Sequence, residues 1–247
     1  HGHNLGITNN PEMAIGELQH AALGKVSVTV RNNSRYVSAR WKKGIVSLNV
    51  PQGVRIIDLH RILDDLTPRL LANRPKVSYY DGMELMFPFV DFVIRRQGFA
   101  PSKILGTASV PVSSVEVGSD FDFDSEQTSL AISDMLCKIA RKVAPKVLVP
   151  HARQLASDIG RSPMGWTISS GHRILGQCTG RGIISLSYVL LFLPDDLRDY
   201  VICHELAHLS EMNHGPGFHQ LLDSYLGGRE SELVKKLNTY RWPVFRK

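Results

Sequence analysis

Two histidines and a glutamate in the C-terminal third have the spacing of a catalytic metal site. His204, Glu205 and His208 stand in the order His-Glu-x-x-His. On a helix, residues four apart lie one turn apart on the same face, so the two imidazoles can bind one metal ion together. Glu205 lies about 100° around the helix from His204, where it can flank the metal without binding it. This arrangement is typical of zinc hydrolases and predicts Zn²⁺ as the cofactor.

A zinc ion that keeps one position open for water needs a third protein ligand. His214, which follows His208 by six residues, is the predicted third ligand. Asn213 can adopt the left-handed conformation that ends helices, so it can turn the chain back toward the metal. Glu211 is the alternative ligand, but it follows His208 by three residues, where the helix can still be running.

The chemistry predicted for this group is hydrolysis of an amide bond in a peptide or protein substrate. Zinc would acidify a water molecule and polarise the carbonyl group. Glu205 would take a proton from the attacking water and pass it to the leaving nitrogen. A further donor is needed for the charge that develops on the carbonyl oxygen. The candidates, among which the sequence does not choose, are Arg173, Arg181, Tyr188 and His219.

Residues 145–226 resemble the YgjP-like metallopeptidase-type domain family, which is related to the WLM and SprT-like zincins. The resemblance is looser over residues 25–143. It implies a zincin fold with three histidine ligands and Glu205 as the catalytic acid and base. One motif departs from the family, because Leu175-Gly-Gln-Cys178 stands where Trp-Gly-Ser-Cys is usual. The zinc ligands that the resemblance implies are His204, His208 and His214. The residues that carry the resemblance are Gly176-Gln-Cys178, Gly182-Ile-Ile-Ser-Leu-Ser187, Leu193-Pro194, Asp199–Leu209, Asn213-His214 and Phe218.

The helices predicted around the motif begin and end at recognisable signals. Residues 130–143 carry apolar side chains at helical spacing, and Pro150 is predicted to open a second helix that ends at Gly160. The motif helix is predicted to begin at Pro194, because two aspartates follow in the favourable first turn. A further helix is predicted over residues 217–226.

Strands are predicted on both sides of these helices. Residues 164–169 and 182–187 are expected to pair after a turn at Ser170-Gly171, and the second of them could pair with an extended substrate. Residues 25–30, 36–41 and 45–50 alternate with period two and predict an antiparallel meander. Asp58 is predicted to cap the helix that follows.

Together these patterns predict an α+β protein. Residues 1–24 are expected to be irregular, and residues 25–123 to form a β-rich N-terminal region. Residues 124–247 are expected to form a zincin-like hydrolase domain, with helices packed on a small antiparallel sheet.

Composition restricts the classes of protein further. The chain has 247 residues, a formal net charge of +6 and three cysteines without a C-x-x-C pair. The odd, sparse cysteines argue against a disulfide framework or a zinc ribbon and fit a reducing compartment, so a cytoplasmic location is expected. No apolar run reaches about 18 residues, so no membrane span is expected. The sequence indicates no oligomeric state.

Two other functions stay open as alternatives. The net charge, the basic cluster at residues 138–146 and the resemblance to SprT-like and WLM proteins are compatible with a DNA-associated protein, or a protease acting on DNA-bound proteins. A solvated helix face is the favoured reading of the cluster, since the chain has no basic tail and no interleaved aromatic stripe. The second alternative is a metal-binding scaffold with little catalysis.

Overall fold

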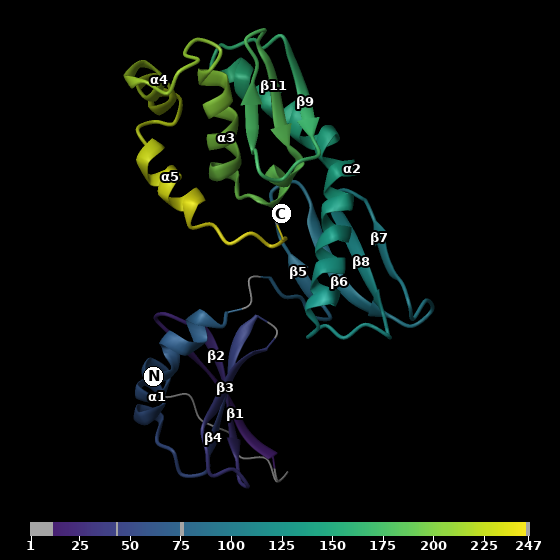
Figure 1. The fold of residues 1–247 in the computed structure, drawn as a ribbon, viewed down its shortest axis with the longest axis vertical. Helices are drawn as coiled ribbons and strands as arrows, with labels where there is room; N and C mark the ends of the chain where they lie inside the picture. The colour runs from purple at the N-terminus through teal and green to yellow at the C-terminus, as the bar shows by residue number, and fades with distance from the viewer. Residues whose placement is uncertain (1–11, 43, 75–76, 246–247) are drawn as a thin grey trace. The chain divides into compact units, whose positions relative to one another are not determined.

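The computed structural model describes residues 12–42, 44–74 and 77–245. The chain forms two compact units that divide between Tyr79 and Tyr80 (Figure 1). Both units combine strands with helices, which confirms the predicted α+β class. The sequence predicts a boundary at Asp124, whereas residues 80–123 belong to the same unit as the later helices.

The first unit is a four-stranded sheet with one helix. Its strands follow the order β1-β2-β4-β3. Alternate side chains of the two central strands, including Val26 and Leu48, are buried against Leu63 of the helix. The elements are β1 (Glu12–His20), β2 (Gly24–Arg31), β3 (Ser38–Lys42), β4 (Ile45–Pro51) and α1 (Ile56–Ala72).

Three expectations for this unit are wrong. β1 occupies residues 12–20, within the segment 1–24 predicted to be irregular, while residues 1–11 lie outside the described part of the chain. β2 pairs with β4 in parallel, so the strands do not form a meander. Period-two alternation identifies a strand's buried face but does not identify its neighbour. Asp58 lies inside the first turn of α1 and pairs with Arg55 at 2.9 Å, because the helix begins two residues earlier.

The second unit begins with a sheet arranged like the first. Its strand order is β5-β6-β8-β7, and the pairings repeat the antiparallel, parallel, antiparallel sequence of the first sheet. A helix follows the last strand in each case, although no repeat is evident in the sequence. The strands are β5 (Met83–Leu85), β6 (Asp91–Gln97), β7 (Ile104–Thr107) and β8 (Val112–Gly118).

A single helix of 33 residues, α2 (Glu126–Asp158), continues through Pro145 and Pro150. The prediction of two helices is therefore wrong. Both prolines lie on the exposed side, whereas Leu148 and Ala152 are buried, so packing keeps the helix continuous. Gly160 follows with a φ of 74°, which agrees with its predicted role at the helix end.

The third sheet supports the motif helix and has the order β10-β11-β9. The strands are β9 (Gly165–Ser169), β10 (Gly176–Cys178) and β11 (Ile183–Ser187). β11 pairs in parallel with β9 and antiparallel with β10, so the predicted hairpin of residues 164–169 and 182–187 is wrong. β11 is the central strand with both edges occupied, which excludes it as a strand that pairs with substrate. Among the residues that the structure describes, no strand pairs with the outer edge of β10.

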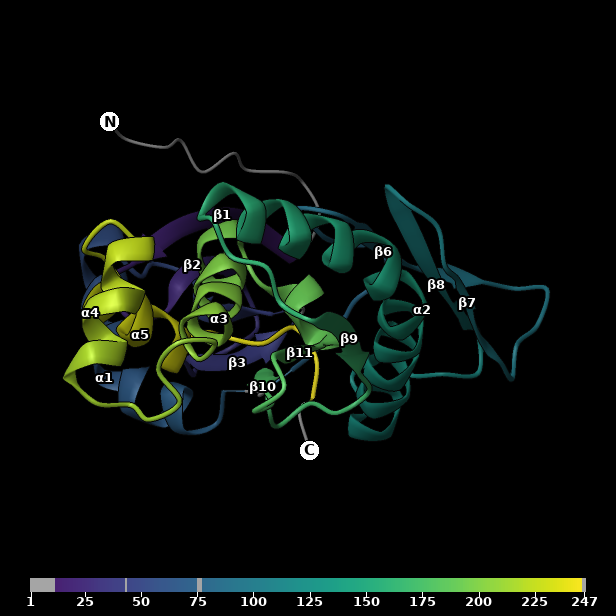
Figure 2. The same ribbon diagram turned by 90° about the horizontal axis from the view of Figure 1, so that it is seen from above.

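The remaining helices complete the second unit: the 3₁₀ helix η1 (Tyr188–Phe192), α3 (Asp195–Ala207), α4 (Pro216–Tyr225) and α5 (Glu230–Asn238). The predicted start of the motif helix is confirmed. α3 packs against β10 and β11, while α2 packs against β9 (Figure 2). None of the described helices is long and apolar enough to cross a membrane.

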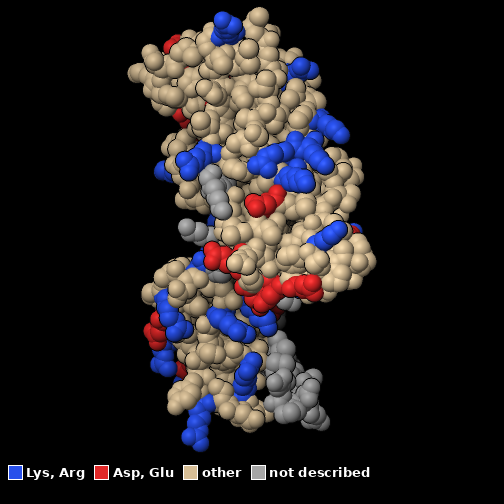
Figure 3. Space-filling model, turned by 45° about the vertical axis from the view of Figure 1, so that its right-hand side comes forward, with Lys and Arg blue, Asp and Glu red and all other residues tan. Residues whose placement is uncertain are grey.

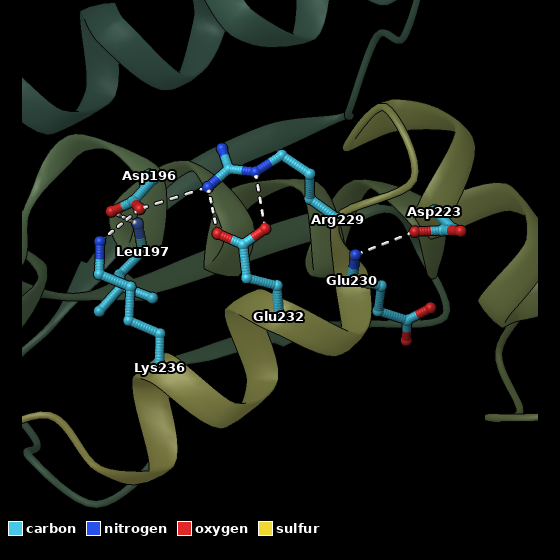
Figure 4. A network of polar contacts seen from close by, with 7 residues as sticks. All are labelled: Asp196, Leu197, Asp223, Arg229, Glu230, Glu232 and Lys236. Atoms are coloured by element: carbon cyan, nitrogen blue, oxygen red, sulfur yellow. Dashed lines mark hydrogen bonds and ion pairs between the residues drawn. The ribbon is translucent and has the colours of Figure 1, made fainter.

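Ion pairs fasten α5 to the start of α3 (Figure 4). Asp196 binds Lys236 at 2.5 Å and lies 3.7 Å from Arg229, which also pairs with Glu232. The pKa of Asp196 is lowered, because these cations and the amide of Leu197 outweigh the effect of burial.

Candidate metal centre

Three histidines converge at the C-terminal end of α3. His204 lies in the last turn of the helix, His208 directly follows it, and His214 comes from the loop before α4. The Nε2 atom of His214 lies 3.1 Å from that of His208 and 3.2 Å from that of His204. One ligand atom from each residue falls within 4.8 Å of the others.

These distances fit a zinc ion. A tetrahedral centre with Zn–N bonds of about 2.0 to 2.1 Å places its nitrogens about 3.3 Å apart. The observed separations differ from that value by a few tenths of an ångström. The donor set also fits, since neutral imidazole is a favoured zinc ligand. The three residues could therefore hold the ion without rearrangement of the chain.

A backbone contact sets the orientation of His208. Its Nδ1 atom lies 2.9 Å from the carbonyl oxygen of Glu211. A carbonyl oxygen accepts hydrogen bonds, so Nδ1 must carry the proton and the Nε2 lone pair must face the other two histidines. Glu211 is brought there because α3 ends and its amide donates to the Ala207 carbonyl at 3.0 Å. Its carboxylate lies beside Gly217, outside the three-histidine group.

The ring of Phe218 packs against the imidazole rings of all three histidines. It is fully buried and stacks on His208 with ring centroids 4.5 Å apart. Its contacts with His204 and His214 are edge-to-face, at 4.9 and 4.8 Å. The same ring packs with Cys203, which is buried and acts as a small apolar side chain. Phe218 thus fixes the positions of three side chains that come from different parts of the backbone.

Burial favours the metal-binding form of His204. Its pKa is lowered to about 4, mainly by burial and further by His208, His214 and His219. The imidazole is therefore neutral near pH 7, which leaves a lone pair for a metal ion.

Glu205 directly follows His204 on α3 and does not belong to the three-histidine group. Its side chain is 6% exposed, and burial raises its pKa to about 7. The backbone of β10 touches it closely, because a Cβ atom built on Gly176 would lie 2.7 Å from Cγ of Glu205. Cys178 is near enough for the Glu205 charge to raise the pKa of its thiol, after the larger effect of burial. A carboxyl group with a pKa near 7 can both accept and donate a proton.

Polar contacts of Asp199 join α3 to α2. Arg198 is 3% exposed, binds Asp199 at 2.9 Å and lies 4.5 Å from the ring centre of Phe89. Asp199 also binds His151 of α2 at 2.7 Å. Burial opposes ionisation of Asp199, but the bonds from His151 and Arg198 lower its pKa overall. This network fixes the helix that carries the motif.

The predicted oxyanion donors lie in different surroundings. Tyr188 is fully buried, and its hydroxyl meets Nδ1 of His172. His219 is half-exposed and lies 2.5 Å from Glu230. Arg173 lines a hollow of about 380 Å³ that also includes Gly176. Arg181 is exposed in the turn before β11.

The structure adds residues that spacing analysis missed. Tyr200 lies one turn before His204 on α3, with ring centroids 6.1 Å apart. Burial raises the pKa of Tyr200, and the charges of Glu230 and Glu205 raise it further, so its hydroxyl stays protonated. The four-residue spacing from His204 could have identified it. No local pattern identifies Gly176 as the neighbour of Glu205, since that contact depends on how β10 packs on α3.

Comparison with known proteins gives one match. A family model described as YgjP-like, metallopeptidase domain, matches residues 100–240. No curated protein and no solved structure matches the chain. The matched range contains the motif helix, the three converging histidines and Phe218.

Proposed function

Because this chain belongs to the YgjP-like metallopeptidase domain family, we propose that it is a zinc-dependent peptidase with His204, His208 and His214 as the zinc ligands. The observation that carries this proposal is the convergence of three Nε2 atoms at the end of α3, the helix that also carries the buried Glu205. The fixed proton on Nδ1 of His208 adds support, because it leaves Nε2 free to bind.

Glu205 is the proposed proton carrier. Zinc, when bound, supplies a Lewis acid and an acidified water molecule. The Glu205 carboxylate accepts a proton as the water oxygen attacks the amide carbon, and then donates that proton to the leaving nitrogen. In the metal-free protein, burial raises the pKa of this carboxyl to about 7, and a bound dication would lower it toward the ionised form that accepts a proton. The contact with Gly176 restricts the carboxyl to one region of the site.

The substrate is proposed to bind as an extended strand along β10. No described strand pairs with the outer edge of β10, and its first residue touches the carboxyl-bearing side chain of Glu205. Backbone hydrogen bonds to β10 would therefore bring a substrate amide bond next to Glu205. Strand pairing uses main-chain groups, which fits a peptide or protein substrate.

The oxyanion donor is proposed to be a side chain at the margin of this group. Tyr200 and His219 are the better placed candidates, because the ring of Tyr200 contacts His204 and the charge of His219 lowers the pKa of His204. Arg173 stays a candidate through its position in the hollow beside Gly176. Tyr188 is less suited, since its hydroxyl is already engaged by His172 and buried.

Glu205→Gln tests the proposal directly. We expect this variant to retain zinc and to lose hydrolysis of a casein or peptide-library substrate by about 10² to 10⁴-fold. Glu211→Gln is the matched control, because the same chemical change is made at an exposed carboxylate in the adjoining loop. Full activity in zinc-loaded Glu205→Gln contradicts the assignment. Stoichiometric zinc without hydrolysis of any peptide in wild-type protein would instead indicate a metal-binding scaffold.

A further inference from the structure

Helix α2 carries a basic stripe made of Lys138, Lys142, Lys146 and Arg153, all exposed. At about 100° per residue these four fall within roughly 80° of one another around the helix, and they extend over about 22 Å. Residues 135–157 contain no Asp or Glu. Figure 3 shows Lys and Arg side chains gathered on the second unit at the height of α2, above a group of acidic residues. The stripe is thus a row of exposed cations on a helix segment without acidic side chains.

The stripe is also unpaired. Within the described residues, none of its four side chains forms an ion pair, whereas Arg95 pairs with Glu116 and Lys236 with Asp196. A helix whose charges serve only solubility can contain both acidic and basic residues. Helix α5 is an example, because it has Glu230 and Glu232 in its first turn and lysines in its last turn. Unpaired cations at regular spacing are a surface suited to a polyanion.

At its C-terminal end the stripe continues into a hollow of about 450 Å³ between α2 and β9. Its lining combines two guanidinium groups, two hydroxyls and an aromatic ring, and includes no acidic side chain. Arg161 bonds to Ser210 Oγ, which leaves most of its donors available. The residues concerned are Arg153, Ser157, Arg161, Ser162 and Trp166.

We propose that the α2 stripe and this hollow form a binding site for single-stranded nucleic acid. The lysines would contact successive phosphates, and Trp166 with Arg153 and Arg161 would stack on a base at the end of the stripe. Cationic grooves joined to an aromatic platform bind single strands without sequence preference. The site shares no residue with the proposed zinc ligands, so binding is expected to persist when the metal is removed.

Fluorescence anisotropy with a labelled oligodeoxythymidine, in the presence of EDTA, tests the site. Three phosphate contacts, one for each lysine, predict a slope of about −2.1 for log K against log salt, or about 20-fold weaker binding at 200 mM than at 50 mM salt. Lys142→Glu is expected to reduce the slope by at least about 0.7. Lys235→Glu makes the same charge change on α5 and should leave both slope and affinity unaltered. Equal effects of the two variants would overturn the proposal, because they would reflect net charge alone.

Two further measurements identify the partner. Trp166→Ala should weaken binding at least about fivefold with an unchanged salt slope, and Trp166→Phe should restore it. Tighter binding to a duplex of the same length, or equal competition by anionic phospholipid vesicles, would contradict the single-strand assignment. Absence of binding at low salt would remove it altogether, whatever the outcome of the peptidase assays.

Discussion

Replacing Glu205 with glutamine is expected to stabilise the metal-free protein while lowering the proposed peptidase activity by about 10² to 10⁴-fold. The folded state raises the pKa of this carboxyl from 4.5 to about 7 through burial. Below pH 4.5 the carboxyl is protonated in both the folded and unfolded states and does not affect the pH dependence. As the pH rises from 4.5 to 7, the unfolded chain loses its proton first, so the folded state loses stability relative to it.

The magnitude follows from that difference in pKa. A change from 4.5 to about 7 corresponds to on the order of 3 kcal/mol, since each pKa unit is about 1.4 kcal/mol. Glu205→Gln removes this loss, because the amide stays neutral at every pH. The variant should therefore exceed wild type in stability by about 3 kcal/mol at pH 8, and the difference should vanish near pH 4.

Urea unfolding followed by circular dichroism, with EDTA present throughout, measures this difference. Wild type, Glu205→Gln and Glu211→Gln are compared at several values between pH 4 and pH 8, so that titration of all other groups cancels. Glu211→Gln should follow wild type, because Glu211 is exposed. A Glu205→Gln variant that is no more stable than wild type at pH 8 would refute the claim that this carboxyl is buried at an energetic cost.

Three other predictions follow from the same geometry. Phe218→Ala should lower the free energy of unfolding by about 3 to 5 kcal/mol and weaken zinc binding, because it removes a buried ring that packs against three imidazoles. Urea unfolding and zinc titration measure the two effects, and Phe99→Ala, which removes an exposed ring, should change neither. Gly176→Ala should retain zinc but lose most hydrolytic activity, since the added methyl would approach Glu205 to 2.7 Å; activity equal to wild type would contradict that contact. Zinc binding at pH 6 should release about one proton more from wild type than from Glu205→Gln, because a nearby dication lowers the pKa of the Glu205 carboxyl. Calorimetry in buffers of different ionisation enthalpy measures the number of protons released, and equal release from the two proteins would argue against a carboxyl close to the zinc ion.

Local signals in the sequence predicted the helices around the metal centre well. Pro194 with its following aspartates marked the start of α3, and the helix predicted over residues 217–226 is α4, which begins at Pro216. His204 and His208 are four residues apart at one helix end, so the closeness of their imidazoles could be predicted without knowledge of tertiary contacts. For His214 to reach the other two histidines, the chain has to turn back after the helix, and Asn213 indicated such a turn.

Features that depend on tertiary contacts were not predictable in the same way. Strand periodicity located β9 and β11 but not their parallel pairing, because alternation carries no information on direction. Pro150 indicated a helix start, yet burial of Leu148 and Ala152 keeps α2 continuous. The approach of Gly176 to Glu205 joins two segments through sheet packing, and no local spacing encodes it.

The most direct test of the central claim is the zinc content of protein purified without added metal. Elemental analysis should find close to one zinc per chain in wild type and a loss of most of it in His214→Ala. His219→Ala, a histidine five residues further on that pairs with Glu230, should keep its zinc. Full zinc in His214→Ala, or no zinc in wild type even after incubation with the metal, would contradict a centre built by His204, His208 and His214.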